Sequence, residues 1–221
     1  MTAYVEAEKA AGRNVVSFAL RATSNTDPFA MFESKEAASM PQLVLAPKPP
    51  SQDIPLPAIA DGFVRNGSFG NTNYGNDGLL NVKLSGTSGN TRESVLKFDI
   101  SSLPATFSAA KLRLFGMLTN VLDSGTPNVG VFKSINDAWT ETGVTWNNRP
   151  ATSGGAVATK AITGTTGQWY EWDLTSMIQA ERAAGNQILT LVLRATNTTN
   201  PMATFNSGEA ASNTPELLVT T

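Results

Sequence analysis

Two adjacent aromatic residues, Trp169 and Tyr170, follow a glycine-rich turn at residues 163–167. Large aromatic side chains at such a position can present a flat apolar ring to a ligand, and the faces of sugar rings stack on surfaces of this kind. We therefore predict a stacking platform at Trp169 and Tyr170.

A second pair of tryptophans, Trp139 and Trp146, lies in the segment WTETGVTWNNRP, together with Asn147 and Arg149. Rings flanked by amide and guanidinium groups are typical of a corner that is fixed by buried aromatic residues and side-chain hydrogen bonds. For these four residues we predict a structural role.

Basic residues alternate with apolar residues along several expected strands, and this pattern places them on the face opposite the core. The residues concerned are Lys83, Lys97, Lys111, Arg113 and Arg194. A row of such cations would suit a uronate or sulfated chain, because arginine can bind a carboxylate through two hydrogen bonds. The alternative is that outward strand positions are simply polar and that lysine protects sheet edges.

Carboxylates at expected turns and strand ends offer oxygen ligands for a structural calcium ion. The residues are Asp61, Asp77, Asp99 and Asp173, and no EF-hand spacing is present. Aspartate is also common in turns without any metal, and no cofactor is required.

Glu141 and Glu171 could in principle form the carboxylate pair of a glycosidase, but nothing in their spacing singles them out. We therefore do not expect catalysis.

Composition excludes several classes of protein. The 221 residues include no cysteine and no histidine, so disulfides and the usual zinc, copper and iron ligands are absent. The net charge of −2 gives no reason to expect a nucleic-acid partner. There is no apolar run long enough to span a membrane, and no secretory signal at the start of the chain. We expect an excerpt of a longer secreted protein.

The elements that must position these residues are mostly strands. Period-two alternation recurs at residues 80–84, 94–98, 111–115 and 189–194, and glycine-rich turns separate these runs. One short helix is expected from Thr175 to Ala184, with Gly185 ending it. The sequence therefore predicts an all-β fold, a jelly-roll-like antiparallel β-sandwich with one short helix.

An internal repeat divides the chain. Residues 5–45 align with residues 178–219, and about half of the aligned positions are identical. We predict that residues 1–45 are the C-terminal fragment of a preceding repeat, with strands at 15–23 and 42–45. Residues 46–57, which carry five prolines, would be a linker, and residues 58–221 a complete module.

Five segments, in order and at normal spacing, resemble the DNRLRE domain, also classed as carbohydrate-binding module family 96. They are ADGFVRNGSFGNTNYGND, RESVLKFDISSLP, AKLRLF, WTETGVTWNNRP and WYEWDLTSMIQAERAAG. The resemblance covers the whole of residues 58–221 and implies a non-catalytic β-sandwich module of secreted proteins that bind polysaccharides. Acidic glycans such as alginate are among the ligands that it implies.

Two functions follow as expectations. The first is non-catalytic binding of an extracellular, acidic polysaccharide. The alternative is a structural repeat of a fibre, adhesin or cell-surface assembly. Because residues 1–45 lack the rest of their sandwich, they cannot bury their apolar face alone, and we expect self-association through them.

Overall fold

The computed structural model describes residues 1–24, 27, 30–44, 51–119 and 125–221. The chain divides into two compact units, residues 1–48 and 49–221, and each is described by itself.

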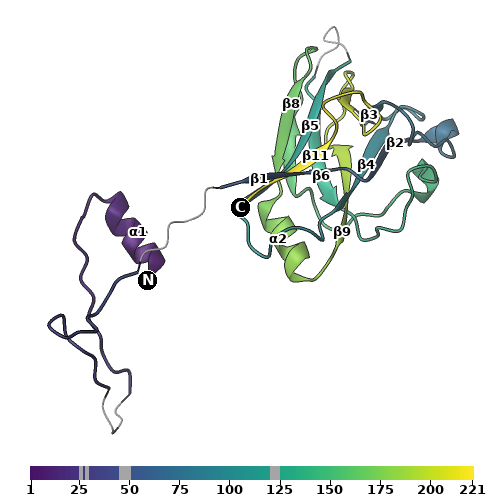
Figure 1. Cartoon of the computed structure of the whole chain (residues 1–221). Helices are drawn as coiled ribbons and strands as arrows, with labels where there is room; N and C mark the ends of the chain where they lie inside the picture. The colour runs from purple at the N-terminus through teal and green to yellow at the C-terminus, as the bar shows by residue number, and fades with distance from the viewer. Residues whose placement is uncertain (25–26, 28–29, 45–50, 120–124) are drawn as a thin grey trace. The chain divides into compact units, whose positions relative to one another are not determined.

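The C-terminal unit is a sandwich of two antiparallel sheets, and its fold is the one predicted from the alternation (Figure 1). Sheet A has six strands in the order β1-β11-β5-β10-β3, with β8 on the other side of β5. These strands are β1 (Asp53–Pro57), β3 (Leu79–Val82), β5 (Ala109–Leu118), β8 (Gln168–Asp173), β10 (Ala203–Asn206) and β11 (Glu216–Thr220). Sheet B has five strands in the order β2-β4-β9-β6-β7. They are β2 (Ala60–Arg65), β4 (Arg92–Asp99), β6 (Asn128–Lys133), β7 (Ala158–Ala161) and β9 (Ile188–Ala195).

The main core lies between the sheets. Leucines and aromatics at alternate positions of the facing strands bury their side chains there, with Trp172 and Phe205 among the largest. The indole of Trp172 donates a hydrogen bond to the carbonyl of Val129 and so joins the two sheets. Helix α2 (Thr175–Ala183) buries Ile178 in the same core and ends before Gly185, whose φ of 80° suits glycine. The expected helix is thus confirmed.

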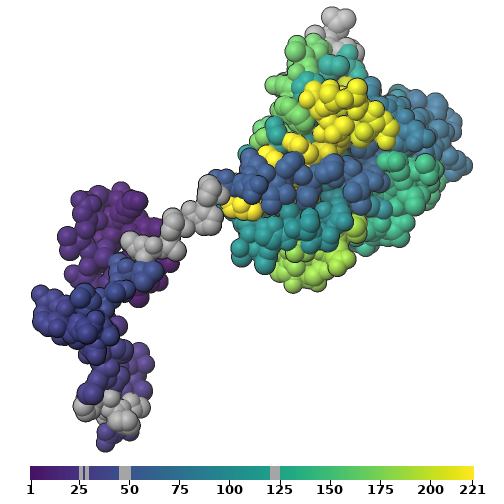
Figure 2. Space-filling view, in the orientation of Figure 1, coloured from purple at the N-terminus to yellow at the C-terminus, as the bar shows by residue number. Residues whose placement is uncertain are grey.

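β1 lies at the edge of sheet A, beside β11 (Figure 2). Its residues belong to the stretch 46–57 for which a proline-rich linker was predicted. That prediction is wrong for Asp53–Pro57, because Pro55 and Pro57 sit on an edge strand, where a missing N–H costs no ladder hydrogen bond.

Sheet B is covered on both faces. Val64, Val95 and Val192 point away from the main core and pack with Val144, Trp139 and Trp146 in a second apolar cluster. The cover is the segment of residues 139–150, which includes the short 3-10 helix η2 (Trp146–Asn148). The non-core face of β4 and β9, from which Lys97 and Arg194 were predicted to project, is therefore partly covered, because a long loop folds back over it.

In the N-terminal unit, helix α1 is Thr2–Ala10, the repeat counterpart of α2, but the described residues contain no strand. The predicted strand at 15–23 is wrong; of the one at 42–45, residues 42–44 are not extended in a sheet and residue 45 lies outside the described residues. Helix hydrogen bonds are local, whereas a strand needs a neighbouring strand. In the described residues, no helix is long and apolar enough to cross a membrane.

Candidate functional site

Two of the predicted sugar-binding cations are held by neighbouring groups on the outer face of sheet B. Lys97 donates a hydrogen bond to the carbonyl of Trp139 (2.5 Å) and lies 4.7 Å from the centre of its ring. Arg194 pairs with Glu93 at 2.9 Å. Lys97 thus fixes the cover, and Arg194 is held by Glu93 and by the hydroxyl of Thr152, so both side chains are already engaged within the module.

Further contacts of the segment come from the residues assigned a structural role. The Trp139 indole donates to the hydroxyl of Thr190, and the Arg149 guanidinium lies 3.8 Å from the Trp146 ring centre and bonds to Glu93. The Asn147 amide donates to the side chain of Asn71 at 2.7 Å.

The outer face of sheet A carries the predicted aromatic platform. Trp169 is half-buried, contacts Phe115 edge to face and lies 4.6 Å beneath the Arg113 guanidinium. Tyr170 alternates to the core side of β8 and is 4% exposed, with its hydroxyl bonded to Thr163. The prediction that Tyr170 presents an exposed ring is therefore wrong, because neighbouring residues of a strand face opposite ways.

Charges on this face are balanced. Arg113 stands opposite Glu216 on β11 and Glu171 on β8, and forms ion pairs with both, at 2.6 and 3.0 Å. Lys111 also pairs with Glu171, at 3.0 Å. The pKa of Glu171 is lowered, chiefly by its hydrogen bond from Lys111. The two cations of this face thus meet two carboxylates.

The five predicted cations do not form one row. Lys97 and Arg194 lie outside sheet B, whereas Lys111 and Arg113 lie outside sheet A, on the other side of the sandwich. The strand order, which the sequence does not reveal, separates them.

A different row of cations exists where β2 and β4 meet the chain that leaves β3. Arg65 stands directly opposite Arg92, and Arg92 stands opposite Lys83 through a bridge on its other side. Opposed residues of antiparallel strands point to the same face, with Cβ atoms roughly 4.5–5.5 Å apart. We call these three residues the cation row.

In the described part of the chain, no carboxylate lies within ion-pair distance of the cation row. Within the described residues, the side chain of each cation donates a hydrogen bond to a backbone carbonyl alone: Arg65 to Gly89, Arg92 to Asn90, and Lys83 to Asn200. Burial, and next the charge of Arg65, lower the pKa of Arg92. The Arg65 guanidinium also stacks 3.5 Å from the Phe69 ring centre.

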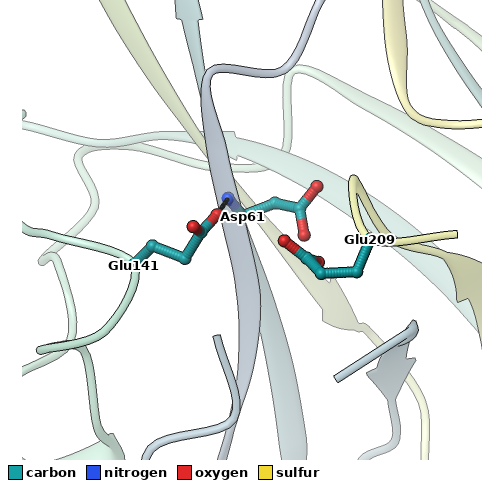
Figure 3. Close-up of side chains that lie close together, drawn as sticks. All are labelled: Asp61, Glu141 and Glu209. Atoms are coloured by element: carbon teal, nitrogen blue, oxygen red, sulfur yellow. Dashed lines mark hydrogen bonds between the residues drawn. The ribbon is translucent and has the colours of Figure 1, made fainter. Parts of the chain in front are cut away.

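Three carboxylates meet at the opposite end of β2. Asp61, Glu141 and Glu209 each place an oxygen within 4.8 Å of the others (Figure 3). The other calcium candidates lie elsewhere in turns: Asp77 accepts a hydrogen bond from the Leu79 amide, and Asp173 from Thr175. Asp99 likewise accepts from the Ser101 amide.

Residues 52–221 match the family described as carbohydrate-binding module family 96. The chain belongs to this family. Members are non-catalytic modules that bind carbohydrate, so binding rather than turnover is the function of these residues. The resemblance identified from the sequence segments is thereby confirmed.

A curated relative is a gellan lyase from Bacillus sp., 27% identical over 175 residues, which is 77% of this chain. The chain spans only 6% of that protein's length. In the module itself, the two acids considered for catalysis lie apart in the fold: Glu141 is in the covering segment beside Asp61, whereas Glu171 is on β8 and pairs with Lys111 and Arg113.

Sequence reasoning missed Arg65, Arg92 and Glu209. Arg65 and Arg92 each open or close a strand, and only the register of β2 against β4 makes them neighbours. Glu209 lies in the loop after β10, far from Asp61 in the sequence. In sequence, Arg65 could have been found as the residue that continues the alternation Asp61, Phe63, Arg65 on one face of β2.

Proposed function

We propose that this module binds an acidic polysaccharide and that the cation row provides the contacts to its carboxylate or sulfate groups. The observation that carries the proposal is the pair of like-charge register contacts, Lys83 with Arg92 and Arg92 with Arg65, without a counter-ion among the described residues. Like charges opposite one another destabilise a sheet, so a row of this kind is expected where an anion is bound.

The contrast with sheet A supports this choice. There each cation stands opposite a carboxylate, and the same face of the sheet already satisfies Lys111 and Arg113. An acidic glycan would have to displace these pairs. At the cation row it would instead replace water, and arginine can bind a carboxylate through two hydrogen bonds.

Polar groups beside the row suit sugar hydroxyls. The loop of residues 85–91 lies next to Arg65 and Arg92, since its Gly89 and Asn90 carbonyls accept their hydrogen bonds. Phe69 and Tyr74 are half-buried aromatic rings near the same strand, Tyr74 being stacked on Phe63 at 4.2 Å. Rings of this kind can stack on the apolar face of a sugar.

The test is electrophoresis in gels that contain alginate, pectate, gellan, xylan or cellulose, at low and moderate salt. We expect an acidic gel to retard the full chain at low salt and moderate salt to relieve the retardation, because exposed charges are screened. The double variant Arg65→Gln with Arg92→Gln should lose at least tenfold in affinity.

The matched control removes two positive charges elsewhere. Lys111→Gln with Lys160→Gln changes the net charge equally but leaves the cation row intact, and it should bind like the wild type. If the control loses affinity as much as the row variant, net charge alone explains binding. If only Trp169→Ala abolishes binding, and salt has no effect, the outer face of sheet A is the site for an uncharged sugar.

We further propose that the module works outside the cell as part of a larger polysaccharide-processing or polysaccharide-binding protein. This proposal is supported by membership of carbohydrate-binding module family 96 and by similarity to a small part of a gellan lyase. If the wild-type chain bound none of the polysaccharides in the gel panel, this proposal would be contradicted.

A second candidate function is self-association through residues 1–45. Large apolar side chains of this segment are about 80% exposed, including Val15, Leu20, Met31 and Phe32. In the module, the repeat counterparts of Leu20 and Phe32, namely Leu193 and Phe205, are buried. Light scattering of the full chain and of the Leu20→Asp, Phe32→Asp variant tests this. Equal monomer masses would refute it.

A further inference from the structure

Asp61, at 1% exposure, is the most buried acidic residue in the described part of the module. One of its oxygens, Oδ2, accepts a hydrogen bond from the Gly208 amide at 2.7 Å. The other, Oδ1, has no hydrogen-bond donor among the described residues. Leaving a buried carboxylate oxygen without a partner costs free energy, so this atom requires an explanation.

Two further carboxylates approach the same point. Figure 3 shows the carboxyl groups of Asp61 and Glu209 pointing toward one another, while Glu141 reaches the cluster from the other side. Glu141 accepts a hydrogen bond from the Asp61 backbone amide at 2.8 Å. Three negative groups this close repel one another unless a proton or a cation lies between them.

The position of Glu141 is fixed by its surroundings. The Asn73 amide donates to the carbonyls of Glu141 and Val144, both at 2.7 Å. Gly75 packs so closely that a Cβ there would lie 2.2 Å from the Glu141 carbonyl oxygen. The acids therefore come from three chain segments: strand β2, the covering segment, and the loop between β10 and β11.

We propose that Asp61, Glu141 and Glu209 bind a calcium ion that ties these three segments together. Calcium takes six to eight oxygen ligands and accepts carboxylates with water completing its shell. In this arrangement Oδ1 of Asp61 coordinates the ion, and the negative charges of the three carboxylates attract it. Glu209 is exposed, so the ion can enter and leave from its side.

The raised pKa of Asp61 bears on calcium binding at this site. Burial raises the pKa of Asp61 to about 7, and the charges of Glu209 and Glu141 act in the same direction, against the hydrogen bond from Gly208. Calcium binding at these carboxylates therefore competes with protonation of Asp61 and releases its proton. No polysaccharide is needed for this, so the calcium site stands independently of the proposed function.

Isothermal titration of calcium chloride into the full chain, stripped with EDTA and held at pH 8, tests the proposal. We expect one ion per chain, and a rise in the melting temperature of about 3–5 °C at ten times the dissociation constant. Magnesium should bind more weakly, because it demands tighter octahedral geometry.

Two variants locate the site. Glu209→Gln removes one exposed ligand without disturbing the core and should weaken calcium binding at least tenfold. Asp137→Asn, in the exposed chain just before the covering segment, removes one negative charge outside the cluster and should bind calcium like the wild type. Absence of heat and of a melting shift at millimolar calcium would overturn the proposal. Equal affinity of wild type and Glu209→Gln would overturn it too.

Discussion

Replacing Asp61 with asparagine should stabilise the metal-free module strongly at pH 8 and much less at pH 4.5. Asparagine resembles the protonated form of the carboxyl group. Its oxygen can accept the hydrogen bond from Gly208, and its NH₂ takes the place of the Asp61 oxygen that has no donor among the described residues. The substitution therefore removes the ionisation and keeps the shape.

The magnitude follows from the raised pKa. Burial is the main reason that the pKa of Asp61 lies at about 7 rather than at 3.8. Each pKa unit is worth about 1.36 kcal/mol, so ionising Asp61 in the folded state costs roughly 4 kcal/mol more than in the unfolded chain. Asp61 is almost fully buried, so solvent screening does not reduce this figure much.

The sign of the pH dependence is set by which state holds the proton. Between about pH 4 and pH 7 the folded chain keeps a proton on Asp61 that the unfolded chain has released. The contribution of this group to stability is therefore present below pH 4, falls as the pH rises to about 7, and stays constant above that. Asp99, Asp173 and Glu171, whose pKa values are lowered mainly by hydrogen bonds, have the opposite dependence at lower pH.

Urea denaturation of both proteins in EDTA, from pH 4.5 to 8.5, measures the difference. Groups other than Asp61 and its neighbours are common to both proteins and cancel. The unfolding free energy of Asp61→Asn minus that of wild type should grow by about 3 kcal/mol from pH 4.5 to pH 8.5, because about 1 kcal/mol of the whole effect is already present at pH 4.5. Calcium at pH 8 should stabilise the wild type and not the variant. Parallel pH profiles for the two proteins would refute the reasoning.

Two further predictions concern the same surroundings. Gly75→Ala should lower the unfolding free energy by about 1–3 kcal/mol and weaken calcium binding, because the new Cβ would lie 2.2 Å from the Glu141 carbonyl oxygen. Urea denaturation checks this. Gly78→Ala is the control, because a Cβ at Gly78 meets open space. Glu93→Gln should destabilise the module by about 2–3 kcal/mol, because Glu93 is buried and pairs with both Arg194 on β9 and Arg149 of the cover. Glu171→Gln breaks exposed pairs and should cost less than about 1 kcal/mol, and an equal loss in both variants would contradict the distinction.

Local patterns in the sequence were sufficient to predict the family, the class of fold and the short helix of the module. The segments that identify carbohydrate-binding module family 96 can be read directly, and period-two alternation is a property of each strand alone. Helices α1 and α2 occupy corresponding residues of the repeat, although only α2 packs against a core. A helix satisfies its hydrogen bonds within its own residues, so the same sequence gives the same element in both settings.

Strand order, register and the path of the long loops could not be predicted from local sequence patterns and were known only once the tertiary structure was determined. Alternation shows that Lys97 and Lys111 face away from the core, but not that their strands belong to different sheets. The cation row arises because Arg65, Arg92 and Lys83 fall into register, and the carboxylate cluster because three distant segments converge. Residues 15–23 remain without a strand, although their repeat counterpart forms β9. Strand hydrogen bonds are made to other parts of the chain, and so are the contacts of a site built across strands; neither is encoded in the spacing of residues along one segment.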